Sequence, residues 1–228
     1  MTHIMKSAKE TSTNAQCQQL DGFHSLVQEL SGKLDAAKSL LFSEICDPDA
    51  VIQRMEEYRS NRVEWAKYAH ADASQTFTRN MVERGSGKSN ILILVWTPGK
   101  ESPVHDHAGS HCVMKVLQGS LKETQYRWPE PKVTEQCQHS PLQVQGSALF
   151  NRDDVTYISD NHGLHKISNP DGEEFAVTLH LYAPPNAAKE GCQVFDEKTG
   201  KANRVIQYDI YSEMGEKKKC GKTCGQLA

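Results

Sequence analysis

The chain has 228 residues, 37% hydrophobic and 24% charged, and its 26 Lys and Arg against 29 Asp and Glu give a net charge of -3. This composition is typical of a folded protein that buries a sizeable core, and it excludes a disordered chain and a strongly basic nucleic-acid binder. The longest strongly apolar run, residues 91–96, is far shorter than the roughly 20 residues that cross a bilayer. Ten His and seven Cys are the unusual counts.

The N-terminal part of the chain is predicted to be helical after a tail. Residues 1–19 are polar and lack the apolar segment of a signal peptide, so we expect a flexible tail and a cytoplasmic protein with reduced thiols. Between residues 20 and 41, apolar side chains recur at steps of three and four, which predicts a helix. Pro48 suits the first turn of a second helix with Asp47 as its cap, and a third helical stretch is expected over 63–68.

After about residue 71 the pattern changes to short strands separated by turns. No helical pattern of 10–15 residues lies between the strands, so a parallel sheet is disfavoured and an antiparallel sandwich or barrel is predicted. The chain is therefore predicted to be one mainly β domain over 20–211, with helices in 20–70, a β-barrel in 71–211 and a flexible tail over 212–228. The predicted strands are 76–82, 90–96, 111–117, 121–128, 148–151, 156–158, 175–182 and 204–211, with a hairpin turn at 85–88.

The histidines are gathered: seven of the ten lie between His105 and His180. His105 and His107 form an H-x-H pair, and on a strand positions i and i+2 point to the same face, so both imidazoles can reach one metal ion. Imidazole suits Fe, Zn, Cu and Ni, but an isolated H-x-H is weak evidence for any of them.

The residues around this pair form a longer pattern, G-x5-H-x-H-x4-C-x6-G, which runs from Gly99 to Gly119. It resembles the first motif of the cupin superfamily, with Cys112 at the position that is usually Glu. His165 and Asn169 match the H-x3-N core of the second cupin motif. Cupins are double-stranded β-helix barrels of the jelly-roll type, so the resemblance implies that fold. The residues alone leave Cys112 open, either as a fourth metal ligand or as a small buried hydrophobe.

Residues 105–126 closely resemble the eukaryotic cysteine dioxygenases. The segments Thr78-Arg79-Asn80, Gly163-Leu164-His165 and Leu179-His180-Leu181-Tyr182-Ala183-Pro184-Pro185 share this resemblance, which extends over about residues 20–211.

The resemblance implies a role for each matched position. His105, His107 and His165 match the ligands of a mononuclear Fe(II). Cys112 and Tyr182 match a pair that forms a thioether cross-link beside the iron. Arg79 matches the arginine that binds the substrate carboxylate, and its planar guanidinium suits that task. Thr178, His180 and Tyr182 match an outer-sphere relay with Thr in place of Ser, and Phe77 stands where many relatives carry a Tyr near the substrate.

The implied activity is an Fe(II)-dependent dioxygenase that oxidises L-cysteine with O2 to cysteine sulfinate, in cysteine catabolism toward hypotaurine and taurine. Two alternatives remain at this point. One is a dioxygenase for another small thiol such as 3-mercaptopropionate, against which Arg79 and Cys112 argue. The other is a metal-binding cupin that is not an oxygenase, in which Cys112 and Tyr182 would have only packing roles. No association motif is visible, so we expect a monomer without nucleic-acid or membrane partners.

Overall fold

The computed structural model describes residues 20–36, 48–130, 140–206 and 209–218. The helical part begins with α1 (Gly22–Ala36), α3 (Pro48–Glu57) and α4 (Arg62–Trp65), followed by a 3-10 turn at Ala66–Tyr68. Pro48 starts α3 as predicted. Its predicted cap Asp47, the helical pattern beyond residue 36 and the predicted tail at 1–19 lie outside the described residues.

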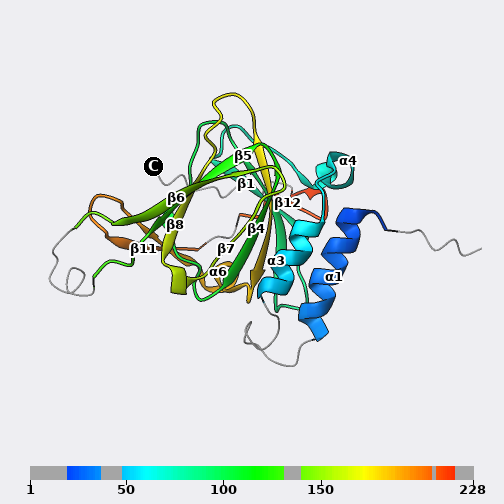
Figure 1. Cartoon of the computed structure of the whole chain (residues 1–228), viewed down its shortest axis with the longest axis horizontal. Coiled ribbons are helices and arrows are strands. Elements are labelled where there is room, and N and C mark those ends of the chain that lie inside the picture. The colour runs from blue at the N-terminus through cyan, green and yellow to red at the C-terminus, as the bar shows by residue number, and fades with distance from the viewer. Residues whose placement is uncertain (1–19, 37–47, 131–139, 207–208, 219–228) are drawn as a thin grey trace, which may run out of the picture.

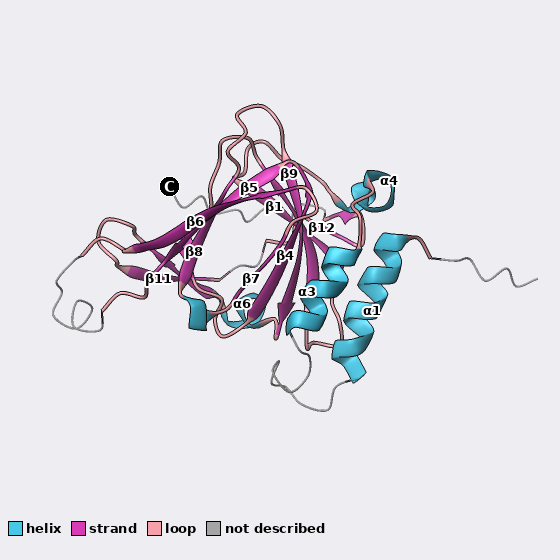
Figure 2. Ribbon diagram, viewed as in Figure 1, coloured by secondary structure: helices cyan, strands magenta, loops and turns pink. Residues whose placement is uncertain are grey.

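The rest of the described chain is mostly strand, arranged in two sheets (Figures 1 and 2). The larger sheet has the order β13 (Glu216–Lys217), β12 (Ser212–Glu213), β1 (Phe77–Glu83), β2 (Asn90–Trp96), β9 (Ala176–Ala183), β4 (His111–Gln118) and β7 (Val155–Ile158). The smaller sheet has the order β11 (Ala202–Val205), β10 (Cys192–Phe195), β3 (Val104–His105), β8 (Leu164–Ser168), β5 (Ser120–Tyr126) and β6 (Val144–Asn151). Neighbouring strands are antiparallel apart from β1 and β12.

The two sheets enclose one part of the core between them. Leu94 and Met114 from the larger sheet pack in one buried cluster with Leu121 and Ile167 from the smaller sheet. The predicted mainly β barrel of the double-stranded β-helix type, with N-terminal helices, is therefore confirmed. The space between the sheets is where a site can be built, because side chains from both sheets point into it.

The helices cover the outer face of the larger sheet. Phe23 and Leu26 of α1 and Met55 of α3 belong to the same buried cluster as Ile91 and Ile93 of β2. Since successive side chains of a strand point to opposite faces, the intervening residues of β2 face the interior of the barrel. All seven residues of β2 are buried, which explains why its sequence is apolar without interruption from Ile91 to Trp96.

Several predicted boundaries need correction. The tail predicted over 212–228 begins too early, because Ser212–Glu213 and Glu216–Lys217 pair with each other as strands. Strand β12 also pairs with β1 and so joins the larger sheet. Residues 219–228 lie outside the described part. The predicted strand 204–211 is wrong beyond Val205, where β11 ends, because residues 206 and 209–211 belong to no strand and residues 207–208 lie outside the described part. None of the described helices is both long and apolar enough to span a membrane.

Candidate metal centre and substrate cavity

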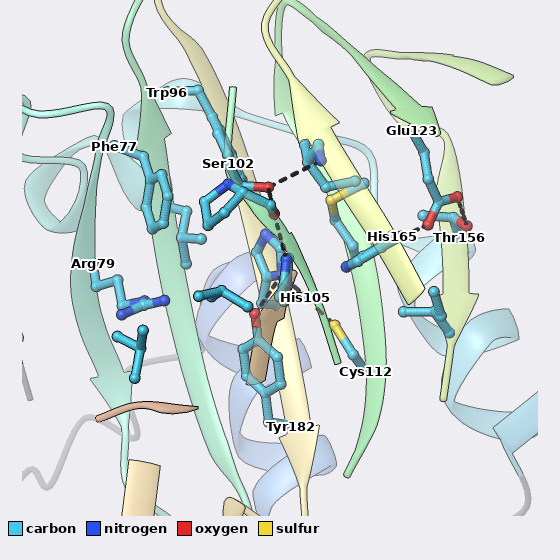
Figure 3. Close-up of a pocket in the computed structure, with 18 of the residues that line it drawn as sticks. Phe77, Arg79, Trp96, Ser102, His105, Cys112, Glu123, Thr156, His165 and Tyr182 are labelled. Carbon is cyan, nitrogen blue, oxygen red and sulfur yellow. Dashed lines mark hydrogen bonds and ion pairs between the residues drawn. The ribbon is translucent and has the colours of Figure 1, made fainter. Parts of the chain in front are cut away.

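A cavity of about 300 Å³ lies between the sheets, and most of the predicted site residues line it (Figure 3). Phe77 and Arg79 reach it from β1, and His180 and Tyr182 reach it from β9. The predicted residues that line it are Phe77, Arg79, His105, Cys112, His165, His180 and Tyr182. A set scattered over about a hundred residues of sequence is thus brought to one enclosed space.

Three histidines form a cluster at this cavity. Potential ligand nitrogens of His105, His107 and His165 all lie within 4.8 Å of one another. The ring centroids are 5.3 Å apart for His105 and His107, and 4.7 Å for each of these rings to His165. His105 of β3 lies directly opposite His165 of β8 in the antiparallel register. The pattern correctly predicted that these side chains meet.

The predicted reason for the H-x-H pair was wrong, because β3 ends at His105 and His107 lies in the loop that follows. Asp160 holds this loop in place: its carboxylate accepts the backbone N–H of His107 at 2.7 Å and that of Gly109 at 2.6 Å. The imidazole of His107 is therefore directed to the cluster by a loop bonded to Asp160 and not by strand alternation.

The hydrogen bonds of the ring nitrogens leave lone pairs for a metal. Nδ1 of His105 lies 3.0 Å from the carbonyl oxygen of Pro103, and a carbonyl can only accept, so Nδ1 carries the proton. Nδ1 of His165 lies 2.7 Å from Glu123 Oε1, and an N–H at this nitrogen likewise leaves Nε2 free. Nδ1 of His107 is buried without a hydrogen-bond partner among the described residues.

The electrostatics of the cluster also suit a metal ion. Burial lowers the pKa of His105 below its ordinary value, and it lowers the pKa values of His107 and His165 well below theirs. The imidazoles are thus neutral ligands at neutral pH, and three of them in one cluster match the donor set that Fe, Zn or Cu accepts. Cys112 does not belong to this cluster, which counts against its being a fourth ligand.

Thr178, His180 and Tyr182 form a hydrogen-bonded row on the inner face of β9. Thr178 Oγ1 lies 2.8 Å from His180 Nε2, and His180 Nδ1 lies 3.2 Å from the Tyr182 hydroxyl. The indole N–H of Trp96 donates to Thr178 Oγ1 at 2.9 Å. Because an indole can only donate, Thr178 keeps its own proton for His180 Nε2, which favours a proton on Nδ1 directed at Tyr182. Burial lowers the pKa of His180 to about 3, so this imidazole is neutral.

Cys112 and Tyr182 lie directly opposite each other on β4 and β9. Cys112 Sγ is also 3.8 Å from His180 Nδ1. Burial raises the pKa of the Cys112 thiol and of the Tyr182 phenol, so both groups are protonated at neutral pH. A thiol and a phenol ring are therefore neighbours at the edge of the histidine cluster.

Arg79 presents a half-buried cation to the cavity. Its guanidinium lies 5.2 Å from the centre of the Phe77 ring, which in turn packs on Trp96 at 4.7 Å. Within the described residues it has no carboxylate within 4.0 Å as an ion-pair partner, and burial lowers its pKa. A desolvated guanidinium facing a cavity suits a carboxylate ligand.

Three residues that hold the site together were not predicted: Trp96, Glu123 and Asp160. A signal existed for Glu123 alone. It lies two residues after Leu121 in β5, so strand alternation places its carboxylate on the same buried face. The bonds of Trp96 to Thr178 and of Asp160 to the His107 loop join strands and loops far apart in sequence and have no local signal.

The chain matches one protein family and several curated relatives over most of its length. The family described as cysteine dioxygenase type I matches residues 25–198. Cysteine dioxygenase type 1 of Danio rerio is 39% identical over 77% of this chain and 82% of its own length. The Bos taurus protein of the same name is 43% identical over 72% of this chain and 76% of its own length. The Homo sapiens protein is 43% identical over 71% of this chain and 75% of its own length. A solved Klebsiella pneumoniae protein with a double-stranded β-helix domain covers 54% of this chain and 88% of its own, at 17% identity and a TM-score of 0.40.

Proposed function

The chain belongs to the cysteine dioxygenase type I family, and from this premise we propose that it is an Fe(II)-dependent enzyme that oxidises L-cysteine with O2 to cysteine sulfinate. The observation that carries the proposal is the position of Arg79 in the same cavity as the three-histidine cluster. An amino-acid thiol needs one group for its carboxylate and one for its sulfur, and these two features supply them.

In this proposal His105, His107 and His165 hold the iron through their free ring nitrogens. Bound iron would supply open coordination positions and the electrons that dioxygen activation requires. The work of the protein is then to position the substrate and to fix charge. Glu123 and the Pro103 carbonyl keep the Nδ1 protons of two ligands in place, which orients the rings.

Arg79 binds the carboxylate of the substrate, and its contact with Phe77 keeps the guanidinium directed into the cavity. Phe77 has no hydroxyl, so the aromatic ring contributes shape and a cation–π contact but no hydrogen bond. Thr178 and His180 orient the hydroxyl of Tyr182 by the hydrogen-bonded row, and the phenol O–H is left to donate toward the reacting groups.

The proposal includes a thioether between Cys112 Sγ and a ring carbon of Tyr182. Forming that bond removes the thiol hydrogen and one ring hydrogen, with two electrons passing to dioxygen as the oxidant. The cross-strand register supports it, because it places the two residues opposite each other. We expect a mass lower by two hydrogens than the sequence predicts after aerobic turnover, and no such loss in Cys112→Ser. An unchanged mass in the wild-type chain after turnover would remove the cross-link from the proposal.

The test of the activity is oxygen uptake with sulfinate formation by the Fe(II)-loaded chain. L-Cysteine should be the preferred substrate over 3-mercaptopropionate, and the reverse preference would reject the cysteine assignment. Arg79→Ala removes two charge-assisted hydrogen bonds worth about 1.5 kcal/mol or more each, so kcat/KM for cysteine should fall about 100-fold with iron content unchanged. Arg127→Ala, an exposed arginine outside the cavity, is the matched control. Equal loss of iron and activity in Arg79→Ala would show that Arg79 does not act on the substrate.

We further propose that the enzyme acts as a cytoplasmic monomer on small molecules only. The buried thiol of Cys112 is free, which is compatible with a reducing compartment. Sedimentation of the purified chain is the direct measurement of its oligomeric state.

A further inference from the structure

A second pocket, of about 430 Å³, lies where the turn between β1 and β2 meets α6 (Asn186–Glu190). We call it the hairpin pocket and define it by the residues that matter for its chemistry: Arg84, Ser89, Asn90, Lys189, Ile210 and Lys218. None of these residues has a part in the mechanism above.

Three cations and no acidic side chain are among the described residues that line the hairpin pocket. Glu213 lies behind it and neutralises part of this charge: Arg84 Nε donates to its carboxylate, and Lys218 Nζ lies 3.3 Å from it. Lys189 Nζ donates to the carbonyl oxygen of Gly87 at 3.1 Å, and no carboxylate of the described residues forms an ion pair with it. The excess of positive charge favours an anionic ligand.

Two buried polar atoms at the pocket have no hydrogen-bond partner in the described part of the chain. They are Ser89 Oγ and Asn90 Oδ1, on side chains that are 1% and 7% exposed. Leaving a buried polar group unpaired costs about 1–3 kcal/mol, and such groups are few in folded proteins. The Ser89 hydroxyl can donate to an anion, whereas the Asn90 oxygen can accept from an ammonium group.

The hairpin pocket lies close to the catalytic cavity but is separate from it. A small cavity of about 40 Å³ lies between them and shares Arg79 and Tyr182 with the catalytic cavity, and Asn90 and Ile210 with the hairpin pocket. Asn90 lies directly opposite Tyr182 in the pairing of β2 with β9. A molecule in the hairpin pocket would therefore be one layer of side chains away from the substrate-binding groups.

We propose that the hairpin pocket is a second binding site for small amino acids that carry an additional acidic group. The acidic group lies against Lys189, Lys218 and Arg84, the Ser89 hydroxyl donates to it, and the ammonium group donates to Asn90 Oδ1. Cysteine sulfinate, the product in the proposed function, belongs to this class, and to that extent the inference rests on the proposed function. Bound there, the product leaves the metal centre open to the next substrate.

Calorimetric titration of the Fe(II)-loaded full chain with L-cysteine sulfinate tests the site, in the absence of oxygen and with L-cysteine saturating the metal centre. One binding event is expected. The double variant Lys189→Gln/Lys218→Gln should weaken it at least tenfold, and Lys122→Gln/Lys201→Gln, two exposed lysines elsewhere, should leave it unchanged. Ser89→Leu fills the pocket and should abolish binding of cysteine sulfinate. If this variant fails to fold, the double lysine variant still tests the proposal.

Four outcomes would overturn the proposal. The first two are an affinity for inorganic sulfate, or for L-alanine, equal to that for L-cysteine sulfinate. The third is an unchanged affinity for cysteine sulfinate in the double lysine variant, and the fourth is loss of cysteine sulfinate binding when cysteine saturates the metal centre. Oxygen uptake is measured in parallel, and the double lysine variant should keep kcat and KM for cysteine within twofold. If no cysteine is oxidised, the proposed function fails while the calorimetric response to the lysine variant still reports on the pocket.

Discussion

Substitution of Glu123 should lower the affinity of the metal centre without replacing any of the three histidine ligands. Its side chain is 2% exposed, and its carboxylate accepts from His165 Nδ1 at 2.7 Å and from Thr156 Oγ1 at 3.3 Å. We expect Glu123→Ala to lower the affinity for Fe(II) and Glu123→Gln to lower it less. The reason is that glutamine retains an acceptor for His165 and loses only the charge.

The size of the effect follows from the buried N–H that alanine would leave behind. An unpaired buried donor costs about 1–3 kcal/mol, which corresponds to about 5- to 150-fold in affinity. Loss of a hydrogen-bond partner behind a metal ligand lowers affinity by about 10- to 100-fold. The two estimates overlap, so we expect about 10- to 100-fold for Glu123→Ala and less than about tenfold for Glu123→Gln.

Competition with a chelator of known affinity measures the dissociation constant of Fe(II) directly. Glu173→Ala, at an exposed glutamate on the loop before β9, is the control for loss of a negative charge. The unfolding midpoint of each metal-free variant separates a loss of metal affinity from a loss of fold. Equal affinities for the alanine variant and the wild-type chain would refute the reasoning, because the hydrogen bond to His165 would then have no influence on the ligand.

Two further predictions concern stability. Lys115 is fully buried, and its Nζ donates to the Asp153 carbonyl at 2.8 Å and lies 3.4 Å from the Asp153 carboxylate. Lys115→Met should therefore lower the free energy of unfolding in urea by about 3 kcal/mol, which is the low end for breaking a buried pair because the Asp153 side chain is 20% exposed. A loss under about 1 kcal/mol would contradict this prediction. Folding lowers the pKa of His180 to about 3, so below about pH 6.5 the unfolded chain binds one more proton at this residue than the folded chain does. As the pH falls, the metal-free protein should therefore lose up to about 1.4 kcal/mol of unfolding free energy per pH unit from this group. His180→Gln should reduce this slope, and an unchanged slope in the variant would disprove the prediction.

The elements that sequence reasoning located well are those whose burial follows a simple period. Strand β2 was predicted with its correct bounds, because its six apolar residues, 91–96, form a run that is short for a helix and suits a strand buried on both faces. The start of α3 at Pro48 was equally clear. In both cases the local physical chemistry of the backbone or of burial decides the structure.

The elements that were missed carry little local signal. Strand β6 is exposed at seven of its eight positions, so its first half has no apolar alternation to reveal it. Strand β3 has two residues and exists because β10 and β8 flank it. The strands β12 and β13 were taken for part of a tail because the segment from Gly215 onward is Lys- and Gly-rich, and what orders β12 is its pairing with β1.

The residues of the site could be predicted from the sequence, whereas their exact geometry could not. The alternation of side chains along the strands of the larger sheet explains why the residues were predictable. On β9, His180 and Tyr182 face the cavity while Leu179 and Leu181 face the helices, and a slip of one residue would exchange these faces. The apolar outer face therefore keeps Cys112 and Tyr182 on the cavity side, and the pairing of β4 with β9 places them opposite each other. The same leucines that hold the helical layer to the barrel thus determine which side chains meet at the metal centre, and a pattern of alternating leucines and chemical side chains encodes both.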